Sequence, residues 1–218
     1  MIEHARALAG DAGAPCGVVT FEPHPRSFFQ GAGAPFRLTP FRQKARLMAG
    51  LGLDLMANFT FDPALAGHLA QDFVATHLLR GLGVSHVVTG PGFVFGKGRR
   101  GNGTVLARMA EMEQFGYSQA PIYAHRGTKV SSTDIRVLLR RGQVDQVAEH
   151  LGHVWEFEGR VQAGEQRGRE MGFPTANQAL DGLLHPGPGI YAVRAGIVDG
   201  KTTTWHDAAA YVGTRPTF

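Results

Sequence analysis

Up to about residue 150, the chain alternates short apolar runs with longer segments in which apolar residues recur every three or four positions. Runs rich in β-branched and aromatic residues predict strands at 17–21, 55–59, 84–88 and 120–123. The helical periodicity predicts helices at 2–8, 64–80 and 105–115, one that starts at Pro40 with Thr39 as its cap, and one that starts at Ser131 or Ser132. This alternation predicts a parallel sheet with helices on both faces.

The pattern changes after residue 150. Residues 155–161, 189–198 and 203–212 have strand-like composition, and glycine and proline occupy the gaps between them. Strand-like segments that follow one another without helices predict an antiparallel barrel or sandwich. We therefore expect an α/β domain at residues 1–150 and a β domain at residues 151–218.

Composition favours a packed globular protein, because 43% of the residues are hydrophobic and 18% are charged. Residues 1–150 carry 16 Lys+Arg against 11 Asp+Glu, a net charge of +5, whereas residues 151–218 carry 6 against 7, a net charge of −1. The basic excess predicts an anionic ligand in the first domain. Nucleic-acid binding usually needs a denser basic run than Lys97-Gly98-Arg99-Arg100, so we expect no nucleic-acid partner.

Cysteine usage and hydropathy limit where the protein works. Cys16 is the single cysteine, which excludes a disulfide within the chain and fits a reducing cytoplasm. It precedes an apolar run, so we interpret it as a core residue and not as a nucleophile. No apolar stretch approaches the ~20 residues that span a bilayer, and the first residues lack the pattern of a signal peptide. We expect a cytoplasmic protein without a membrane partner; the sequence predicts no oligomeric state.

Two serines and a threonine open the helix that begins at Ser131 or Ser132. Their hydroxyls, with the free N–H groups of the first helical turn, suit either a helix cap or a phosphate group. Arg136 follows one turn later, where its guanidinium suits the same anion. Taken alone, this motif fits an ordinary helix start and a phosphate site equally well.

Two further segments directly follow predicted strands, where ligands bind in open α/β sheets. Gly90–Gly101 combines glycines, which let a backbone approach a ligand closely, with three basic side chains. Thr20–Pro25 places His24 between two prolines, and a histidine there suits phosphate contact or proton transfer. The simpler interpretations are a flexible basic loop and a stiff turn.

A fourth segment lies in the second domain. Gly164-Glu165-Gln166-Arg167-Gly168-Arg169 precedes Gly172-Phe173-Pro174-Thr175-Ala176-Asn177. Thr175 and Asn177 are two residues apart, so an extended chain points both side-chain oxygens to one side. Oxygen ligands suit Mg²⁺ bound together with nucleotide phosphates. A polar turn that enters a strand is the simpler interpretation.

Taken in order, these motifs resemble the prokaryotic bifunctional riboflavin kinase/FMN adenylyltransferase family, also called FAD synthetase. The resemblance covers essentially the whole chain and rests on seven pieces: Thr20–Pro25, Leu38–Pro40, Gly90–Gly101, Ser131–Arg136, Arg167–Asn177, Pro186–Val193 and Gly213–Phe218. It implies a Rossmann-like nucleotidylyltransferase domain followed by a riboflavin-kinase β-barrel. The first would transfer AMP from ATP to FMN, giving FAD, and the second would phosphorylate riboflavin to FMN. ATP, Mg²⁺, riboflavin, FMN and FAD are the implied ligands.

The resemblance also assigns residues. It implies ATP and phosphate binding by Ser131, Ser132, Thr133, Arg136, His24, Gly90, Phe95, Gly96 and Arg99. It implies flavin binding by Phe36, Leu38 and Thr39. It implies binding of ATP in the kinase by Gly164, Arg167, Gly168, Thr175 and Asn177, with Thr175 and Asn177 as ligands of Mg²⁺.

Three features of the family pattern are missing from the sequence. The family has a first strand with a His-x-Gly-His turn that contacts ATP, and further barrel strands with a glutamate that acts as the kinase base. The family also usually has an acidic or amide residue where this chain has Gly92. We therefore expect a chain truncated at both ends, with no complete catalytic set and little or no turnover in either reaction. The alternative is a non-catalytic remnant that binds nucleotide or flavin.

Overall fold

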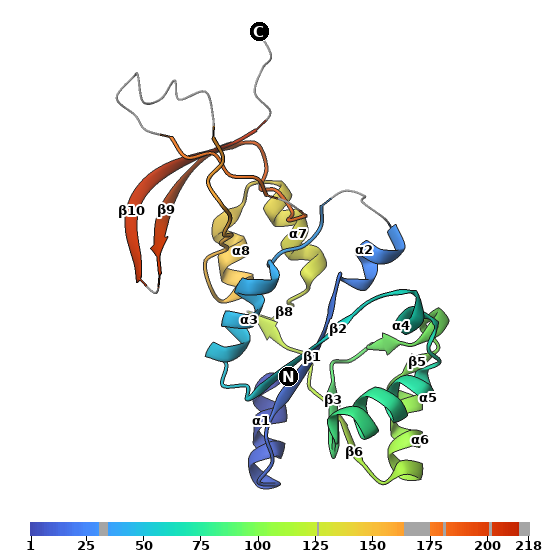
Figure 1. Cartoon of the computed structure of the whole chain (residues 1–218). Coiled ribbons are helices and arrows are strands. Elements are labelled where there is room, and N and C mark those ends of the chain that lie inside the picture. The colour runs from blue at the N-terminus through green and yellow to red at the C-terminus, as the bar shows by residue number, and fades with distance from the viewer. Residues whose placement is uncertain (31–34, 126, 164–174, 181, 201, 214–218) are drawn as a thin grey trace. The chain divides into compact units, whose positions relative to one another are not determined.

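The computed structural model describes residues 1–30, 35–125, 127–163, 175–180, 182–200 and 202–213 (Figure 1). The chain divides into two compact units. Unit 1 comprises Met1–Gly33 and Lys44–Ala124, and unit 2 comprises Ala34–Gln43 and His125–Phe218.

Unit 1 is built on two pairs of parallel strands. β1 (Gly17–Glu22) pairs with β2 (Leu55–Thr60), in a register that runs from Gly17 opposite Leu55 to Glu22 opposite Thr60. β3 (His86–Thr89) pairs with β6 (Gly116–Gln119). Parallel neighbours need a long connection, and helices supply it in both cases. The predicted parallel pairing is confirmed, although the described strands form two-stranded sheets and not one continuous sheet.

Most helices of unit 1 follow the predicted periodicity, with one break and with α2 as an additional helix. They are α1 (Ile2–Asp11), α2 (Pro25–Gln30), α4 (Pro63–Gly67), α5 (Ala70–Phe73), the π-helix η1 (Val74–Gly81) and α6 (Gly103–Glu113), while α3 (Phe41–Gly50) runs from unit 2 into unit 1. The single helix expected at 64–80 is wrong. Gly67 is a poor helix former, and the two residues after it are extended, so the helix ends and restarts at Ala70. Helix α3 starts one residue after the expected Pro40.

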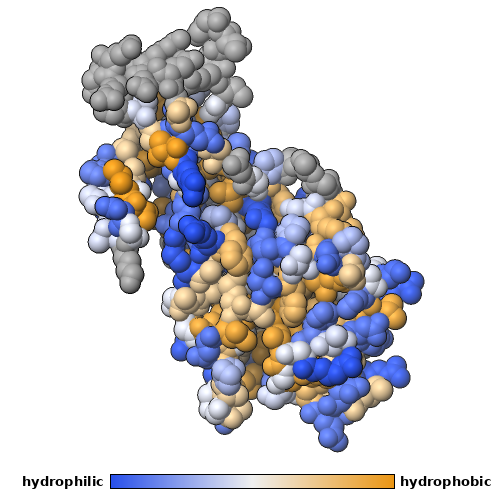
Figure 2. All heavy atoms as spheres, in the orientation of Figure 1, coloured by the Kyte–Doolittle hydropathy of each residue, from blue (hydrophilic) through white to orange (hydrophobic). Residues whose placement is uncertain are grey.

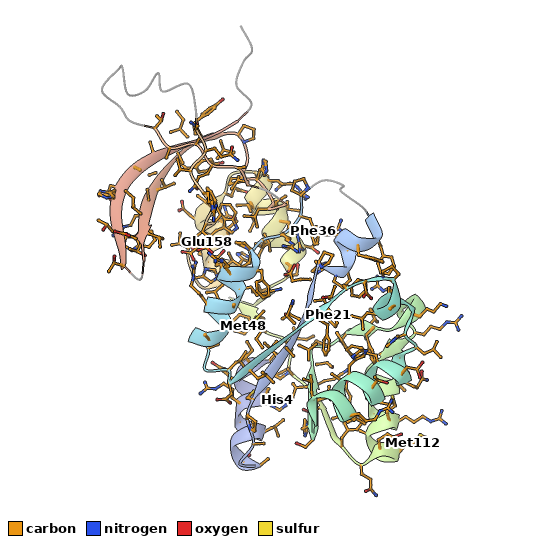
Figure 3. All side chains as sticks on the ribbon, viewed as in Figure 1. His4, Phe21, Phe36, Met48, Met112 and Glu158 are labelled. Carbon is orange, nitrogen blue, oxygen red and sulfur yellow. The ribbon has the colours of Figure 1, made fainter. Side chains whose placement is uncertain are left out.

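The core of unit 1 lies between α5, η1 and α6. Its buried members are Phe73, Val74, Leu78, Leu106, Met109 and Phe115. Phe21 of β1 packs against Phe59, Phe61 and Phe73 with ring centroids 5.9–6.3 Å apart, so aromatic rings connect the strands to this core (Figure 3). Cys16, at the start of β1, is buried, as the sequence predicted.

Unit 2 has a helical part and a hairpin. α7 (Ser132–Arg140) packs on α8 (Val144–Leu151), and Ile135, Leu139, Val147 and Leu184 form their shared core. β9 (Gly189–Asp199) and β10 (Thr202–Val212) form an antiparallel hairpin, close to the two predicted strands. Figure 2 shows apolar side chains at the surface of this hairpin, where Ile190, Ile197 and Val198 are exposed.

Two predicted strands are wrong. The strand expected at 120–123 lies four residues earlier as β6, because Pro121 lacks the N–H that a sheet requires. Residues 155–161 form no strand; the Trp155 indole instead donates a hydrogen bond of 2.8 Å to the Leu38 carbonyl and packs against the α7–α8 core. The described part of the chain contains no closed barrel. Its second half holds the β9–β10 hairpin, and isolated bridges join Gln162 to Asn177 and Arg37 to Leu183. The helices α2 and α8 were not predicted.

Short elements complete the chain. β4 (Val94–Phe95) and β5 (Gly101–Asn102) form an antiparallel hairpin around the 3-10 turn η2 (Lys97–Arg99), and β7 (Ala124–His125) pairs with β8 (Thr128–Lys129). No helix in the described residues is both long enough and apolar enough to span a bilayer.

Candidate functional site

The segment after β1 is fixed at both of its ends. Glu22, the last residue of β1, forms an ion pair of 2.8 Å with Lys44 of α3, and both side chains are about one-fifth exposed. His24 is exposed, and its Nδ1 accepts a hydrogen bond of 3.1 Å from the Arg26 N–H at the start of α2. This bond orients the imidazole with Nε2 as the protonated nitrogen in the neutral ring. The predicted site residue therefore lies at the surface, in a defined orientation.

An aromatic cluster follows directly and was missed in the sequence. Phe28 and Phe29 of α2 gather with Phe61, with ring centroids 5.2–5.8 Å apart. Phe29 is 70% exposed although it belongs to this cluster. An exposed ring held by two others offers a face for stacking a planar ligand. The sequence signal was the pair Phe28-Phe29 directly after the His24 segment.

The glycine-rich segment after β3 is a structured hairpin. We refer to residues 94–102, from β4 to β5, as the basic hairpin. Phe95 packs against Phe73 in the core, with ring centroids 6.0 Å apart. A Cβ added to Gly96 would lie 2.8 Å from the Ala70 backbone, and one added to Gly101 would lie 2.8 Å from the Ala70 Cβ. These two glycines therefore let the hairpin approach α5. The alternative interpretation of this segment as a flexible loop is wrong, because the segment forms a hairpin.

The basic side chains of this hairpin face solvent. Lys97, Arg99 and Arg100 are exposed, and the Lys97 N–H donates a hydrogen bond of 2.8 Å to the His68 carbonyl. Arg99 has a φ of 58°, which is uncommon for a residue with a side chain. Gly90 makes the turn that follows β3, where its carbonyl accepts from the Phe93 N–H at 3.3 Å. The hairpin thus presents positive charge on a fixed backbone.

The start of α7 is a helix cap. Ser131 is the N-cap, and its hydroxyl accepts from the Asp134 N–H at 3.2 Å and donates to the Asp134 carboxylate at 2.6 Å. Ser132 and Thr133 are exposed in the first turn, where backbone N–H groups lack helical partners. Ser131 therefore caps the helix in this structure. The exposed hydroxyls of Ser132 and Thr133 are accessible to an anion.

Arg136 makes internal contacts in this structure. Its Nε donates to the Phe36 carbonyl at 2.8 Å and its guanidinium lies 5.2 Å from the centroid of the Phe36 ring. A second nitrogen donates to the Ser132 carbonyl at 3.0 Å. Phe36 is 7% exposed and lies beside α7 (Figure 3). A predicted phosphate ligand and a predicted flavin contact are thus brought together within unit 2.

The other predicted flavin residues follow Phe36. Leu38 packs against the α7–α8 core, and Thr39 is half-buried in a bend before α3. Hence the predicted site residues divide between the units: His24, Gly90, Phe95, Gly96 and Arg99 belong to unit 1, and the flavin residues and the α7 motif belong to unit 2.

The kinase segment is described only in part. Gly164, Arg167 and Gly168 lie outside the described residues, as does Gly172–Pro174. Thr175 is exposed, and the Asn177 carbonyl accepts from the Gln162 N–H at 2.7 Å in an isolated antiparallel bridge. A hydroxyl and an amide oxygen, two residues apart, are the donor types that suit the magnesium of Mg–ATP.

Comparison with known proteins gives matches along both parts of the chain. Residues 1–134 match the family model of FAD synthetase, and residues 151–218 match that of riboflavin kinase. The bifunctional riboflavin kinase/FMN adenylyltransferase of Escherichia coli K12 is 35% identical over 203 residues, which cover 93% of this chain and 64% of that protein. The Listeria monocytogenes protein of the same name is 34% identical over 220 residues, covering 100% and 68%. The Pseudomonas fluorescens protein of that name is 36% identical over 217 residues, with the same coverage.

A solved structure gives the fold alone. A protein from Streptococcus pneumoniae, described as a macrolide-efflux protein, superposes with a TM-score of 0.73 at 22% identity and covers 98% of this chain and 74% of that one. The chain thus spans about two thirds of the length of its matched relatives. With more than half of its residues in the FAD synthetase match and a riboflavin kinase match following in order, the chain belongs to the family of bifunctional riboflavin kinases/FMN adenylyltransferases.

Proposed function

We propose that this protein works in FAD biosynthesis, with two ATP-dependent reactions. The α/β part, residues 1–150, serves the transfer of AMP from ATP to FMN. The part at residues 151–218 serves the phosphorylation of riboflavin. The observation that carries the proposal is the order of the two family matches along one chain. A non-catalytic remnant is not favoured, because relatives named for both activities match over the whole chain.

The phosphate side of the adenylyltransferase site rests on two strand ends of unit 1. The exposed His24 follows β1, and the exposed cations of the basic hairpin follow β3, so both segments leave the carboxyl ends of parallel strands. Ligands of open α/β sheets bind at such ends. The proposed roles are contact of His24 with a phosphate oxygen and charge neutralisation by Arg99, while Gly90, Gly96 and Phe95 shape the hairpin. Positioning and neutralisation are what a reaction at phosphorus needs.

The start of α7, within unit 2, is proposed as a phosphate-binding segment of its own. Ser132 and Thr133 expose hydroxyls beside N–H groups of the first helical turn, and the helix dipole favours an anion there. Arg136 keeps two of its donors on carbonyls of unit 2. Its proposed role is to hold Phe36 in place and, as the resemblance implies, to contact a phosphate.

The flavin is proposed to stack on Phe29. That ring is exposed and is held by edge-on contacts with Phe28 and Phe61, at interplanar angles of 84° and 73°. Phe36, Leu38 and Thr39, within unit 2, are separately proposed as flavin contacts, as the resemblance implies.

For the kinase reaction, Thr175 and Asn177 are proposed to hold the magnesium of Mg–ATP, with Gly164, Arg167 and Gly168 around the phosphates. The β9–β10 hairpin is proposed to be part of a riboflavin-kinase barrel, and unit 1 is proposed to follow a Rossmann-like topology. The exposed apolar side chains of the hairpin support the first point, since Ile190 is 77% exposed and Val198 is 68% exposed.

Ligand binding tests the proposal without depending on turnover. Flavin fluorescence would be titrated with purified protein, for FMN and for riboflavin, with and without Mg–ATP. We expect both flavins to bind, and Phe29→Ala to weaken FMN binding about tenfold, because stacking on an aromatic ring is worth about 1–3 kcal/mol. Tyr123→Ala is the matched control, since Tyr123 is also an aromatic residue with 70% exposure. A protein that binds neither flavin nor ATP contradicts the proposal. The cytoplasmic location and the lack of a nucleic-acid partner stay predictions.

A further inference from the structure

Two histidines of unit 1 form a close pair outside the site described above. His68 lies between α4 and α5, and His77 lies in the π-helix η1. The His77 Nε2 is 3.2 Å from the His68 Nδ1, and the rings are stacked with an interplanar angle of 29°. No group of three or more His, Cys, Asp or Glu side chains suited to a metal occurs among the described residues. The contact is therefore a hydrogen bond, with one ring as donor and the other as acceptor.

Two phenylalanine rings contact His77. The Phe59 ring of β2 meets it edge-on at 5.1 Å between centroids, and the Phe73 ring lies at 5.4 Å. Burial, and then the charge of His68, lower the pKa of His77 below the ordinary value of 6.5. A neutral imidazole suits this apolar environment, and the hydrogen bond needs at least one unprotonated nitrogen.

The pair and its neighbours contact the basic hairpin at three points. The His68 carbonyl accepts the Lys97 N–H at 2.8 Å. Phe73, which packs on His77, also packs on Phe95 at 6.0 Å. Gly96 approaches Ala70, two residues after His68, so closely that no side chain fits between them. A change at the pair therefore reaches the hairpin through its backbone and through its core-facing ring.

We propose that the His68–His77 pair positions the basic hairpin, and that opening of the pair as the pH falls releases it. The pair is a positioning element because it acts through Lys97 and Phe95 and does not face a ligand itself. The positioning of the hairpin does not depend on the proposed function. One consequence rests on it, namely that nucleotide affinity falls when the pair opens.

The direction of the pH effect follows from the sign of the shift. A histidine whose pKa is lower in the folded state binds fewer protons folded than unfolded. Its contribution to stability is thus complete above pH 6.5, the ordinary value, and is lost as the pH falls below it. Charged side chains also occur on the elements next to the pair: Asp62 before α4, Asp72 on α5, Arg80 on η1, and Lys97, Arg99 and Arg100 on the hairpin, while β2 carries none. None of these groups lowers the pKa of His77. Among its charged neighbours, His68 does.

Hydrogen exchange of the Lys97 amide in the whole chain tests the proposal, without nucleotide and after correction for intrinsic exchange rates. We expect its protection to fall about tenfold between about pH 7.5 and about pH 5.5, the loss expected when one hydrogen-bonded contact opens. His77→Phe keeps a ring against Phe59 and Phe73 but cannot donate or accept, so its protection should be low at both pH values. His150→Gln, on α8 of unit 2, is the matched control and should behave as the wild type.

Wild-type protection that does not change with pH would overturn the proposal, and this measurement needs no variant to fold. Protection in His77→Phe that follows the wild-type curve would overturn it as well. Affinity for Mg–ATP, measured over the same pH range, separates the two proposals. If protection falls while nucleotide affinity stays constant, the pair positions the hairpin but the hairpin does not bind phosphate, and the proposed function loses that element.

Discussion

Replacement of Gly96 by alanine tests why the basic hairpin has a glycine at this position. Gly96 has a φ of 70° and a ψ of 172°, a backbone region that is essentially limited to glycine. A Cβ at this position would lie 2.8 Å from both the Cα and the N of Ala70. Both are backbone atoms at the start of a helix, so they cannot turn away as a flexible side chain does. Alanine therefore meets a conformational cost and a steric cost.

The two costs can be estimated separately. The backbone conformation costs an alanine about 1–3 kcal/mol. Forcing an additional carbon into a packed contact costs about 1–3 kcal/mol more. We expect Gly96→Ala to lower the free energy of unfolding by about 3 kcal/mol, read from urea denaturation followed by circular dichroism. Gly98→Ala is the matched control, because Gly98 has a φ of 65° and its nearest neighbour is the Arg100 side chain at 3.9 Å. The control should cost about 1–2 kcal/mol, the conformational share alone.

Equal losses of stability in the two variants would refute the reasoning, because the contact with Ala70 would then carry no energy. A Gly96→Ala protein of wild-type stability that no longer binds Mg–ATP would support the other reason for a glycine, which is close approach of the backbone to a ligand.

Three further changes test the packing and the polar contacts. Leu139→Ala removes a fully buried side chain from the α7–α8 core and should cost about 2–5 kcal/mol, which Trp155 fluorescence in urea would report. Ser131→Ala removes the α7 cap and should cost about 1 kcal/mol by the same measurement; no loss would mean that the cap is not formed in solution. Lys44→Gln and Glu22→Gln, with the double variant, should give a coupling energy of up to about 1 kcal/mol, and a value of zero would show that the ion pair contributes nothing.

The elements that the sequence predicted well are those with a strong local pattern. β1, β2, α6 and the β9–β10 hairpin lie within a few residues of the predicted segments, because apolar periodicity and β-branched runs act over neighbouring residues. The errors come from positions where one residue overrides its surroundings. Gly67 splits the helix expected at 64–80, and Pro121 lies inside the strand expected at 120–123, which forms instead at Gly116–Gln119.

The residues of the site could be predicted from the sequence, but the contacts between them could not. His24 and the α7 motif were identified from short motifs, and the structure places them at a strand end and at a helix start. No local pattern shows that Arg136 bonds to the carbonyl of Phe36, 100 residues earlier in the chain. Nor does a local pattern show that Gly96 packs against Ala70, or that Phe29 remains exposed in its cluster. These contacts are tertiary, and they decide which role each residue takes.

Hydrogen exchange with and without FMN and Mg–ATP tests the central claim most directly, because it reports where the ligands bind. We expect slower exchange at α2, residues 25–30, and in the basic hairpin, residues 94–102, when both ligands are present. FMN alone should protect α2, the helix that carries Phe29. Exchange that neither ligand changes at α2 or in the basic hairpin would contradict the claim that these two strand ends bind flavin and nucleotide.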